Sequence, residues 1–284
     1  MGGENMRTGM IDTGTEQLLA EVRDGVALIT LNRPAARNAL GDTITPALRR
    51  QIRDRGAAPD VRALLITGAG DAFCAGGDVK AMGQRRAGSP LTRDEKISQL
   101  KERQRTLTGA LTGLRKPTVA ALPGPAAGAG LAIALACDLR IASANAFVTT
   151  GYARVGLAGD YGIAALLTRL VGTAKARELM FTAARVDAET CARLGLVNKV
   201  VPADELRAAA WDLAKSLANG PARALQLMKD NLDDALTMPF LAALDNEAAR
   251  LVDSAADPDH REAVSAFVER REPSFYPVGE ESDR

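Results

Sequence analysis

The stretch that decides the fold is Pro123-Gly124-Pro125-Ala126-Ala127-Gly128-Ala129-Gly130. It follows an apolar run predicted to be a strand over residues 118–122, and it leads into an apolar helix predicted over 131–136. The first N–H groups of a helix have no partner within it and carry the positive end of its dipole. This segment is therefore a candidate site for an oxyanion.

The same stretch does not fit the known phosphate-binding loops. Ile133 stands where the dinucleotide motif GxGxxG requires its third glycine, and the chain contains no GxxxxGK[ST] motif. The sequence therefore gives no support for a nucleotide-binding enzyme.

A second segment, Asp71-Ala72-Phe73-Cys74-Ala75-Gly76-Gly77-Asp78-Val79-Lys80, lies between a strand predicted over 61–67 and a short helix. Its small residues would let a ligand approach the backbone closely. Alone, the Gly-Gly pair is more typical of a plain turn.

A third segment, Arg154-Val155-Gly156-Leu157-Ala158-Gly159-Asp160-Tyr161-Gly162, ends where a helix is predicted to begin. Asp160 is either an acid/base residue or the N-cap of that helix, because aspartate is favoured at N-caps. The segment alone does not decide between the two.

Outward from these segments, strands alternate with helices. Asp24-Gly25 between two apolar runs predicts a hairpin, and Asp42 is expected to cap a helix that ends near Arg55. Further strands are predicted over 139–142 and 196–201. A mobile loop is predicted over 83–93, followed by a helix to about 114. Three more helices are predicted over 160–171, 173–182 and 187–194. This alternation predicts an α/β fold.

The predicted organisation has three parts. Residues 1–16 are expected to be a disordered tail, 17–201 an α/β core, and 202–284 a helical region divided at Gly220-Pro221, Met238-Pro239 and Pro258. Because its helices follow the alternation instead of completing it, the last part is a candidate subunit contact.

Composition excludes several classes of protein. The 284 residues are 46% hydrophobic and carry a formal net charge of +1, with 4% aromatic residues. Nucleic-acid binding and membrane-surface binding would need a basic excess, and base stacking would need more aromatic side chains. Residues 1–16 lack the apolar core of a signal peptide, and no long uncharged span is present, so we expect a cytoplasmic protein that does not bind membranes.

Metal and triad chemistry have little support. Cys74, Cys137 and Cys191 are widely spaced without a CxxC motif, which is typical of small apolar core residues in a reducing compartment. The single histidine, His260, has no nucleophile motif nearby and is expected at the surface or at a helix start. We therefore expect no metal site.

Taken in order, five blocks of the chain resemble the crotonase superfamily of enoyl-CoA hydratases and isomerases. The blocks are residues 31–40, 73–80, 124–138, 155–172 and 264–271. The resemblance implies a core of repeated ββα units and a C-terminal helical region that assembles trimers or dimers of trimers. It also implies an acyl-CoA thioester as substrate, with no separate cofactor because coenzyme A is part of that substrate.

The resemblance also implies roles for individual residues. The N–H groups of Gly77 and Ala129 would hold the thioester oxygen, and Ala75 would offer its backbone to the adenine. Arg37 would meet the CoA phosphates, and Phe267 and Arg270 would reach the ligand of a neighbouring subunit. The remaining substrate-binding candidates in the matching blocks are Gly76, Asp78, Gly128 and Tyr152.

Two positions depart from the family. Hydratases of this family use two glutamates to activate water, but the matching positions here are Ala132 and Tyr152. Neither can accept a proton from water near neutral pH as a carboxylate can. Asp160 matches an aspartate of dienoyl-CoA isomerases and of 1,2-epoxyphenylacetyl-CoA isomerases, and moving a double bond needs one shuttling base and no bound water. Tyr152 is expected to fill space.

Three hypotheses follow. The first is an isomerase that uses Asp160. The second is a hydratase with unusual acid/base groups. The third is a protein that binds acyl-CoA without catalysis. Asp160 favours the first.

Overall fold

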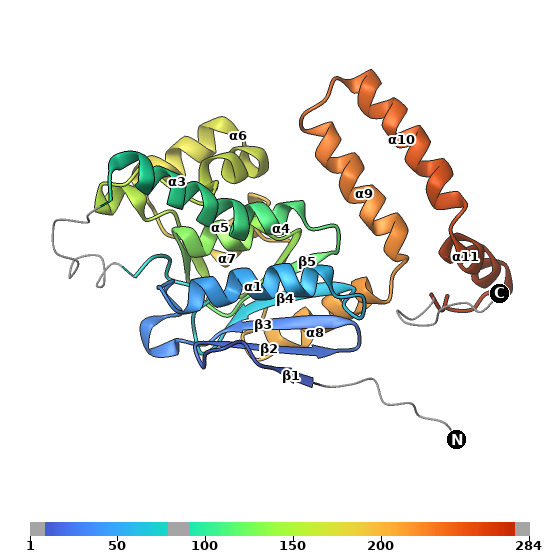
Figure 1. The fold of residues 1–284 in the computed structure, drawn as a ribbon, viewed down its shortest axis with the longest axis horizontal. Helices are drawn as coiled ribbons and strands as arrows, with labels where there is room; N and C mark the ends of the chain where they lie inside the picture. The colour runs from blue at the N-terminus through green and yellow to red at the C-terminus, as the bar shows by residue number, and fades with distance from the viewer. Residues whose placement is uncertain (1–8, 79–90, 276–284) are drawn as a thin grey trace.

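The computed structural model describes residues 9–78 and 91–275 and confirms the predicted α/β class with a helical C-terminal region (Figure 1). Most of the loop predicted over 83–93, and the short helix predicted after Lys80, lie outside the described residues. The larger sheet has the order β1-β2-β3-β4-β5-β7-β10, and a smaller one has the order β6-β8-β9.

The strands have these bounds: β1 Gly9–Ile11, β2 Leu18–Arg23, β3 Val26–Leu31, β4 Ala63–Gly68, β5 Thr118–Leu122, β6 Ala126–Ala127, β7 Leu139–Ser143, β8 Phe147–Thr149, β9 Val186–Asp187 and β10 Lys199–Val201. Strands β1 to β3 pair antiparallel, and β3, β4, β5, β7 and β10 pair in parallel. Strand β1 falls within the predicted tail, so the sheet begins earlier in the chain than the sequence indicated.

The helices have these bounds: α1 Ile44–Ala57, α3 Arg93–Gln104, α4 Ala110–Gly113, α5 Ala129–Ala136, α6 Ile163–Thr182, α7 Ala188–Arg193, α8 Leu206–Ala218, α9 Ala222–Ala235, α10 Phe240–Ala255 and α11 Pro258–Glu269. Short 3-10 turns cover Pro34–Ala36 (η1) and Tyr152–Val155 (η3). A π-helical segment, Arg105–Gly109 (η2), joins α3 to α4.

The hairpin between β2 and β3 is confirmed. Asp24 and Gly25 have φ angles of 51° and 72°, and Arg23 pairs with Val26 across this two-residue loop. Positive φ at both positions is the geometry that Asp-Gly favours, and its twist matches that of the strands.

The larger sheet is covered on both faces, which explains its apolar strands. In β4, Leu64 and Ile66 belong to the core beneath α1 and α5, whereas Ala63 and Leu65 belong to a second core against α8. The same alternation runs through β5, as expected for buried parallel strands. Figure 1 shows α1 and α8 on opposite sides of this sheet.

The loop that precedes Gly77 and the start of α5 meet by close backbone contact. A Cβ atom at Gly124 would lie 1.9 Å from the carbonyl oxygen of Asp71, and one at Gly130 would lie 2.3 Å from that of Cys74. Both distances are far below van der Waals contact, so the two segments pack this closely only because these positions are glycine.

Two sequence predictions about helices need correction. Asp42 does not cap α1, because Thr43 is its N-cap residue and no side chain bonds to that end. The helices predicted over 160–171 and 173–182 form one element, α6, which begins at Ile163. Gly172, with φ 74° and ψ 168°, interrupts it where the sequence placed a stop.

Helices α9 to α11 extend from the core as a limb (Figure 1). They divide at the three proline-marked points that the sequence indicated. Arg115 of the core pairs with Asp230 at 2.6 Å and with Asp233 at 2.9 Å, and Lys229 pairs with Asp138 at 2.8 Å. These ion pairs hold the C-terminal half of α9 against the core.

Candidate active site

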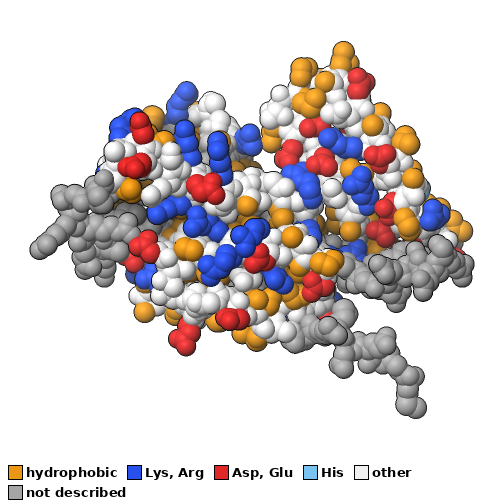
Figure 2. All heavy atoms as spheres, in the orientation of Figure 1, with side chains coloured by type: hydrophobic (Ala, Val, Ile, Leu, Met, Phe, Trp, Pro, Cys, Tyr) orange, Lys and Arg blue, Asp and Glu red, His pale blue; other side chains and the backbone are white. Residues whose placement is uncertain are grey.

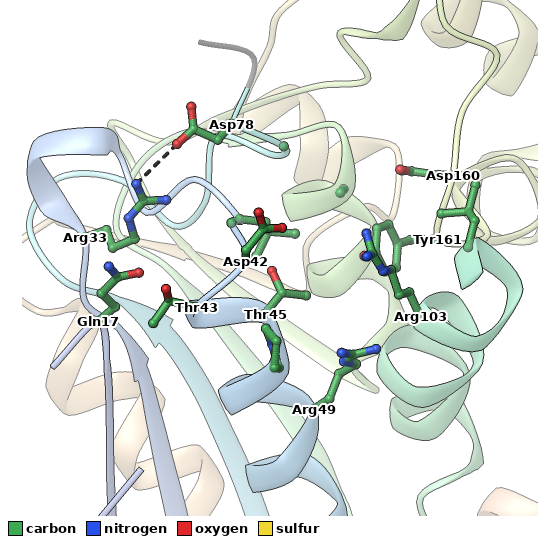
Figure 3. Close-up of a pocket in the computed structure, with 16 residues that line it drawn as sticks. Gln17, Arg33, Asp42, Thr43, Thr45, Arg49, Asp78, Arg103, Asp160 and Tyr161 are labelled. Atoms are coloured by element: carbon green, nitrogen blue, oxygen red, sulfur yellow. Dashed lines mark hydrogen bonds and ion pairs between the residues drawn. The ribbon is translucent and has the colours of Figure 1, made fainter. Parts of the chain in front are cut away.

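One pocket of about 510 Å³ brings together the three residues for which the family resemblance implies a catalytic role. Gly77, Ala129 and Asp160 all line it, between α1, α3, the start of α5 and the loop before α6 (Figure 3). These residues are far apart in the sequence, so the fold itself assembles this group.

The N–H group of Gly77 is directed away from its neighbouring segment. Leu40 donates its N–H to the oxygen of Gly76 at 2.7 Å and accepts from the N–H of Asp78 at 3.0 Å. These two bonds define a parallel bridge between Leu40 and Gly77. In such a bridge the N–H of the central residue points to the opposite side, here away from Leu40.

The N–H of Ala129 opens α5. Gly128 precedes the helix with φ 51° and ψ −124°, and its own N–H donates to the oxygen of Thr149 at 3.1 Å. As the first residue of α5, Ala129 has no carbonyl four positions earlier within the helix. A Cβ atom at Gly76 would lie 3.5 Å from the Ala129 nitrogen, so the two loops adjoin.

Asp160 is not a helix cap, which corrects one of the two interpretations that the sequence left open. The N-cap of α6 is Gly162, and no side chain bonds to that end. Gly159, Tyr161 and Gly162 have φ angles of 114°, 50° and 76°, so the chain around Asp160 is a tight loop. This loop brings Asp160 to the pocket.

The carboxylate of Asp160 has a specific partner. The Tyr152 hydroxyl donates to Asp160 Oδ1 at 2.5 Å, so Tyr152 does more than fill space. Burial raises the pKa of Asp160, and the hydrogen bond from Tyr152 acts in the opposite direction. Burial and the neighbouring Asp160 raise the pKa of Tyr152, which therefore stays a neutral donor.

A buried amide holds the glycine loop in place. The Asn38 side chain is fully buried and donates to the oxygens of Ala69 at 2.9 Å and Ala72 at 2.8 Å. Its own oxygen accepts from the N–H of Arg33 at 2.8 Å. The asparagine thereby ties the segment after β3 to the segment after β4.

Of the other predicted site residues, Asp78 alone lines the pocket, where it pairs with Arg33 at 3.2 Å. The remaining candidates divide between the adjoining loops and α11. Arg37 is exposed, Ala75 is half-buried, and Gly76 and Gly128 flank the two N–H donors, whereas Ala132 is fully buried within α5.

Phe267 and Arg270 lie at the end of α11, on the limb. The Phe267 side chain is 85% exposed, and Arg270 ends the helix with φ 55°. Within this chain the fold does not bring either residue to the pocket that Gly77 lines.

Sequence reasoning missed several polar side chains that line the pocket. They are Gln17, Arg33, Thr43, Thr45, Arg49 and Arg103. Tyr161 also lines it, with its ring between Asp160 and the two arginines of the helices (Figure 3). Apart from Arg33, which lies in the block 31–40, no motif marks these residues. Arg49 and Arg103 come together through the packing of α1 against the α3–η2 helix.

The three cysteines lie in the core, as the sequence analysis expected. All three cysteines are buried, and burial raises the pKa of Cys74, Cys137 and Cys191 to about 12. Within residues 9–78 and 91–275, no cluster of three or more potential side-chain ligands is arranged to hold a metal ion. In the same ranges, no helix has the length and apolar character needed to cross a membrane.

Comparison with known proteins gives matches over most of the chain. Residues 21–277 match the family model described as enoyl-CoA hydratase/isomerase. The chain is 32% identical over 260 residues to the short-chain-enoyl-CoA hydratase of Clostridium acetobutylicum, covering 89% of this chain and 95% of that protein. It is 35% identical over 263 residues to the 1,2-epoxyphenylacetyl-CoA isomerase of Escherichia coli, covering 92% and 98%.

A solved structure extends the likeness to three dimensions. An enoyl-CoA hydratase from a Polaromonas species superposes with a TM-score of 0.84 at 32% identity, covering 90% of this chain and 98% of that one. The match of sequence and fold over nearly the whole chain shows that this protein belongs to the enoyl-CoA hydratase/isomerase family.

Proposed function

We propose that this enzyme moves a carbon–carbon double bond within an acyl-CoA thioester. The N–H groups of Gly77 and Ala129 hold the thioester oxygen, and Asp160 carries a proton between two carbons of the acyl chain. The observation that supports this most directly is that one pocket is lined by both residues with these N–H groups and by Asp160.

The chemistry of the site supports isomerisation over hydration. Removing a proton beside a thioester places negative charge on its oxygen, and a fixed backbone donor there is worth about 3 kcal/mol. Hydration also needs a group that activates water, but alanine and tyrosine stand at 132 and 152. A single carboxylate that first accepts and then returns a proton is sufficient for isomerisation.

Burial adapts Asp160 to this task. A carboxylate with an ordinary pKa is a weak base near neutral pH, and burial raises the pKa of Asp160. Since Tyr152 occupies Oδ1, the proposed proton acceptor is Oδ2.

The direct test is a panel of 2-enoyl-, 3-enoyl- and aryl-CoA thioesters, with products identified by mass and NMR. We expect products of unchanged mass with a shifted double bond. Addition of water would favour the hydratase alternative, and binding without turnover would favour a protein that only holds acyl-CoA.

Replacing Tyr152 with phenylalanine tests the pairing with Asp160. The hydrogen bond lowers the Asp160 pKa, so its loss should raise that pKa further. The deprotonated base would then be lost at a higher pH, and the acidic limb of the kcat/KM profile should move upward in pH. A merely structural role would lower kcat/KM equally at all pH values, and in an Asp160→Asn background the change should have no further effect.

We also propose that the limb assembles the protein into trimers or hexamers. Several of its apolar side chains are exposed, including Phe240 at 77%, Leu251 at 69% and Val252 at 70%. Figure 2 shows hydrophobic side chains along the outer edge of this limb. Exposed apolar surface of this kind is typical of subunit contacts.

Light scattering at micromolar concentration should therefore give the mass of a trimer or hexamer. Leu251→Asp should shift the protein toward smaller species because it places a charge in the contact. Phe181→Asp is the matched control, since Phe181 is 75% exposed on the core helix α6. A monomeric wild-type protein would contradict the proposal.

A further inference from the structure

Two arginines from different helices meet at one end of the pocket. Arg49 comes from α1 and Arg103 from α3, and both line the same cavity as Gly77, Ala129 and Asp160. In Figure 3 both guanidinium groups lie on the side of the pocket that α3 and Tyr161 form.

The charges of these two arginines are not neutralised by the described part of the chain. Arg33 of the same pocket pairs with Asp78, but no ion pair of the described residues includes Arg49 or Arg103. Arg49 is held by a hydrogen bond of 3.4 Å from Nη1 to Thr106 Oγ1, which is a neutral partner. A guanidinium group without an anion is the natural partner of a carboxylate or phosphate.

Tyr161, which lines the same pocket, is close enough to both cations for their charge to affect its hydroxyl. Burial and Asp160 raise the pKa of Tyr161, whereas Arg103 and Arg49 lower it. Tyr161 therefore lies within electrostatic reach of the base on one side and of the two guanidinium groups on the other.

Under the proposed function, this end of the pocket receives the acyl chain and not coenzyme A. Arg37 and Ala75, the residues that the family resemblance places against CoA, do not line the cavity. From the thioester oxygen at Gly77 and Ala129, the pocket continues past Asp160 to Tyr161 and the arginines.

A plain hydrocarbon chain would match only part of this lining. Leu40, Pro46 and Leu100 are apolar, but Asp42, Thr43 and Thr45 line the cavity as well as the arginines. An alkyl chain that displaced water from the threonines and arginines would leave polar and charged groups without partners, which is unfavourable. The π-helical segment that begins at Arg105 distorts the helix next to Arg103, and such segments are frequent at functional sites.

We propose that Arg49 and Arg103 bind an anionic group at the far end of the acyl chain, so that the substrates are acyl-CoA thioesters with a second, terminal carboxylate. This inference rests on the proposed function for the direction of the acyl chain. The binding step requires no turnover and can be tested without it.

Calorimetry with two matched pairs of saturated thioesters separates these questions. The pairs are hexanoyl-CoA with adipoyl-CoA and octanoyl-CoA with suberoyl-CoA, which differ only by the terminal carboxylate. We expect at least one dicarboxylic thioester to bind about tenfold or more tightly than its partner, the usual strength of a charge-assisted bond. Arg49→Gln and Arg103→Gln should each reduce this ratio toward one without weakening the affinity for the monocarboxylic thioester.

The same helices offer control arginines. Arg53 on α1 pairs with Asp54 and is 70% exposed, and Arg93 on α3 lies beside Asp94 and is 85% exposed. Arg53→Gln and Arg93→Gln should leave the ratio as in the wild type.

Three results would overturn the inference. These are equal affinities within both pairs, a preference that survives in Arg49→Gln and Arg103→Gln, and equal weakening of all four thioesters and of free CoA in these variants. The last result would assign the arginines to a CoA phosphate. Saturated thioesters are not isomerised, so this binding test does not depend on turnover. An arginine-dependent preference supports the anion site even if the enoyl-CoA panel shows no isomerisation. Isomerisation without this preference contradicts the anion site and leaves the proposed function standing.

Discussion

Asp160→Asn is expected to lower the isomerisation rate by about a hundredfold to ten-thousandfold, the usual share of a general base. Asparagine has the same shape and still offers an oxygen to the Tyr152 hydroxyl, which lies 2.5 Å from Asp160 Oδ1 in the wild type. The variant therefore removes the basic oxygen and keeps the local packing unchanged. Single-turnover kinetics with a 3-enoyl-CoA measures this loss.

Two controls accompany this variant. Its affinity for a saturated acyl-CoA should match that of the wild type, because the proposed contacts to the thioester are backbone atoms. Its melting temperature should change little, because Asp160 caps no helix. Full activity in Asp160→Asn would remove this residue from the mechanism and leave Tyr152 as the nearest candidate.

Gly77→Pro should reduce activity by about a hundredfold or more, the usual effect of removing an oxyanion donor. Proline has no N–H group, and the two hydrogen bonds to Leu40 use the atoms of Gly76 and Asp78. The substitution therefore deletes the proposed donor without breaking the bridge to Leu40. Steady-state kinetics on the same 3-enoyl-CoA measures the effect.

Gly77→Ala is the matched control because it adds a side chain and keeps the N–H. Positive φ in this loop belongs to Gly76, at 89°, and not to Gly77, so alanine at 77 meets no conformational penalty of that kind. Circular dichroism establishes that both variants are folded. A folded Gly77→Pro variant with wild-type activity would contradict the oxyanion role.

Local signals in the sequence predicted much of the fold. The hairpin followed from Asp24-Gly25, and the interruption of α6 followed from Gly172, because glycine favours positive φ. The limb divided where Pro221, Pro239 and Pro258 indicated. Each feature depends on the conformational preference of one or two residues, so it can be read without knowledge of distant contacts.

The cap interpretation of Asp160, one of the two that the sequence left open, fails for a physical reason. An aspartate shortly before an apolar helix is typical of an N-cap, but Gly159 and Gly162 lengthen the loop and the helix begins only at Ile163. The role of Tyr152 was missed for a related reason, because its hydroxyl finds Asp160 only when η3 and this loop are folded.

The arginines of the pocket could not have been found in the same way. On the predicted helices, Arg49 is indistinguishable by pattern from Arg53, and no pattern marks Arg103. Their different surroundings arise from the packing of α1 near the α3–η2 helix, which no local pattern encodes.

The contact of Gly124 and Gly130 with the carbonyl oxygens of Asp71 and Cys74 has a consequence for how such an enzyme can change over generations. Any side chain at either glycine would push apart the segments that carry the Gly77 and Ala129 amides, so neither glycine can be substituted without disturbing the site. The side chains of Asp160 and of the two helical arginines line the pocket and carry no such constraint. A library randomised at these positions should alter the reaction and the substrate while the N–H groups of Gly77 and Ala129 keep their arrangement.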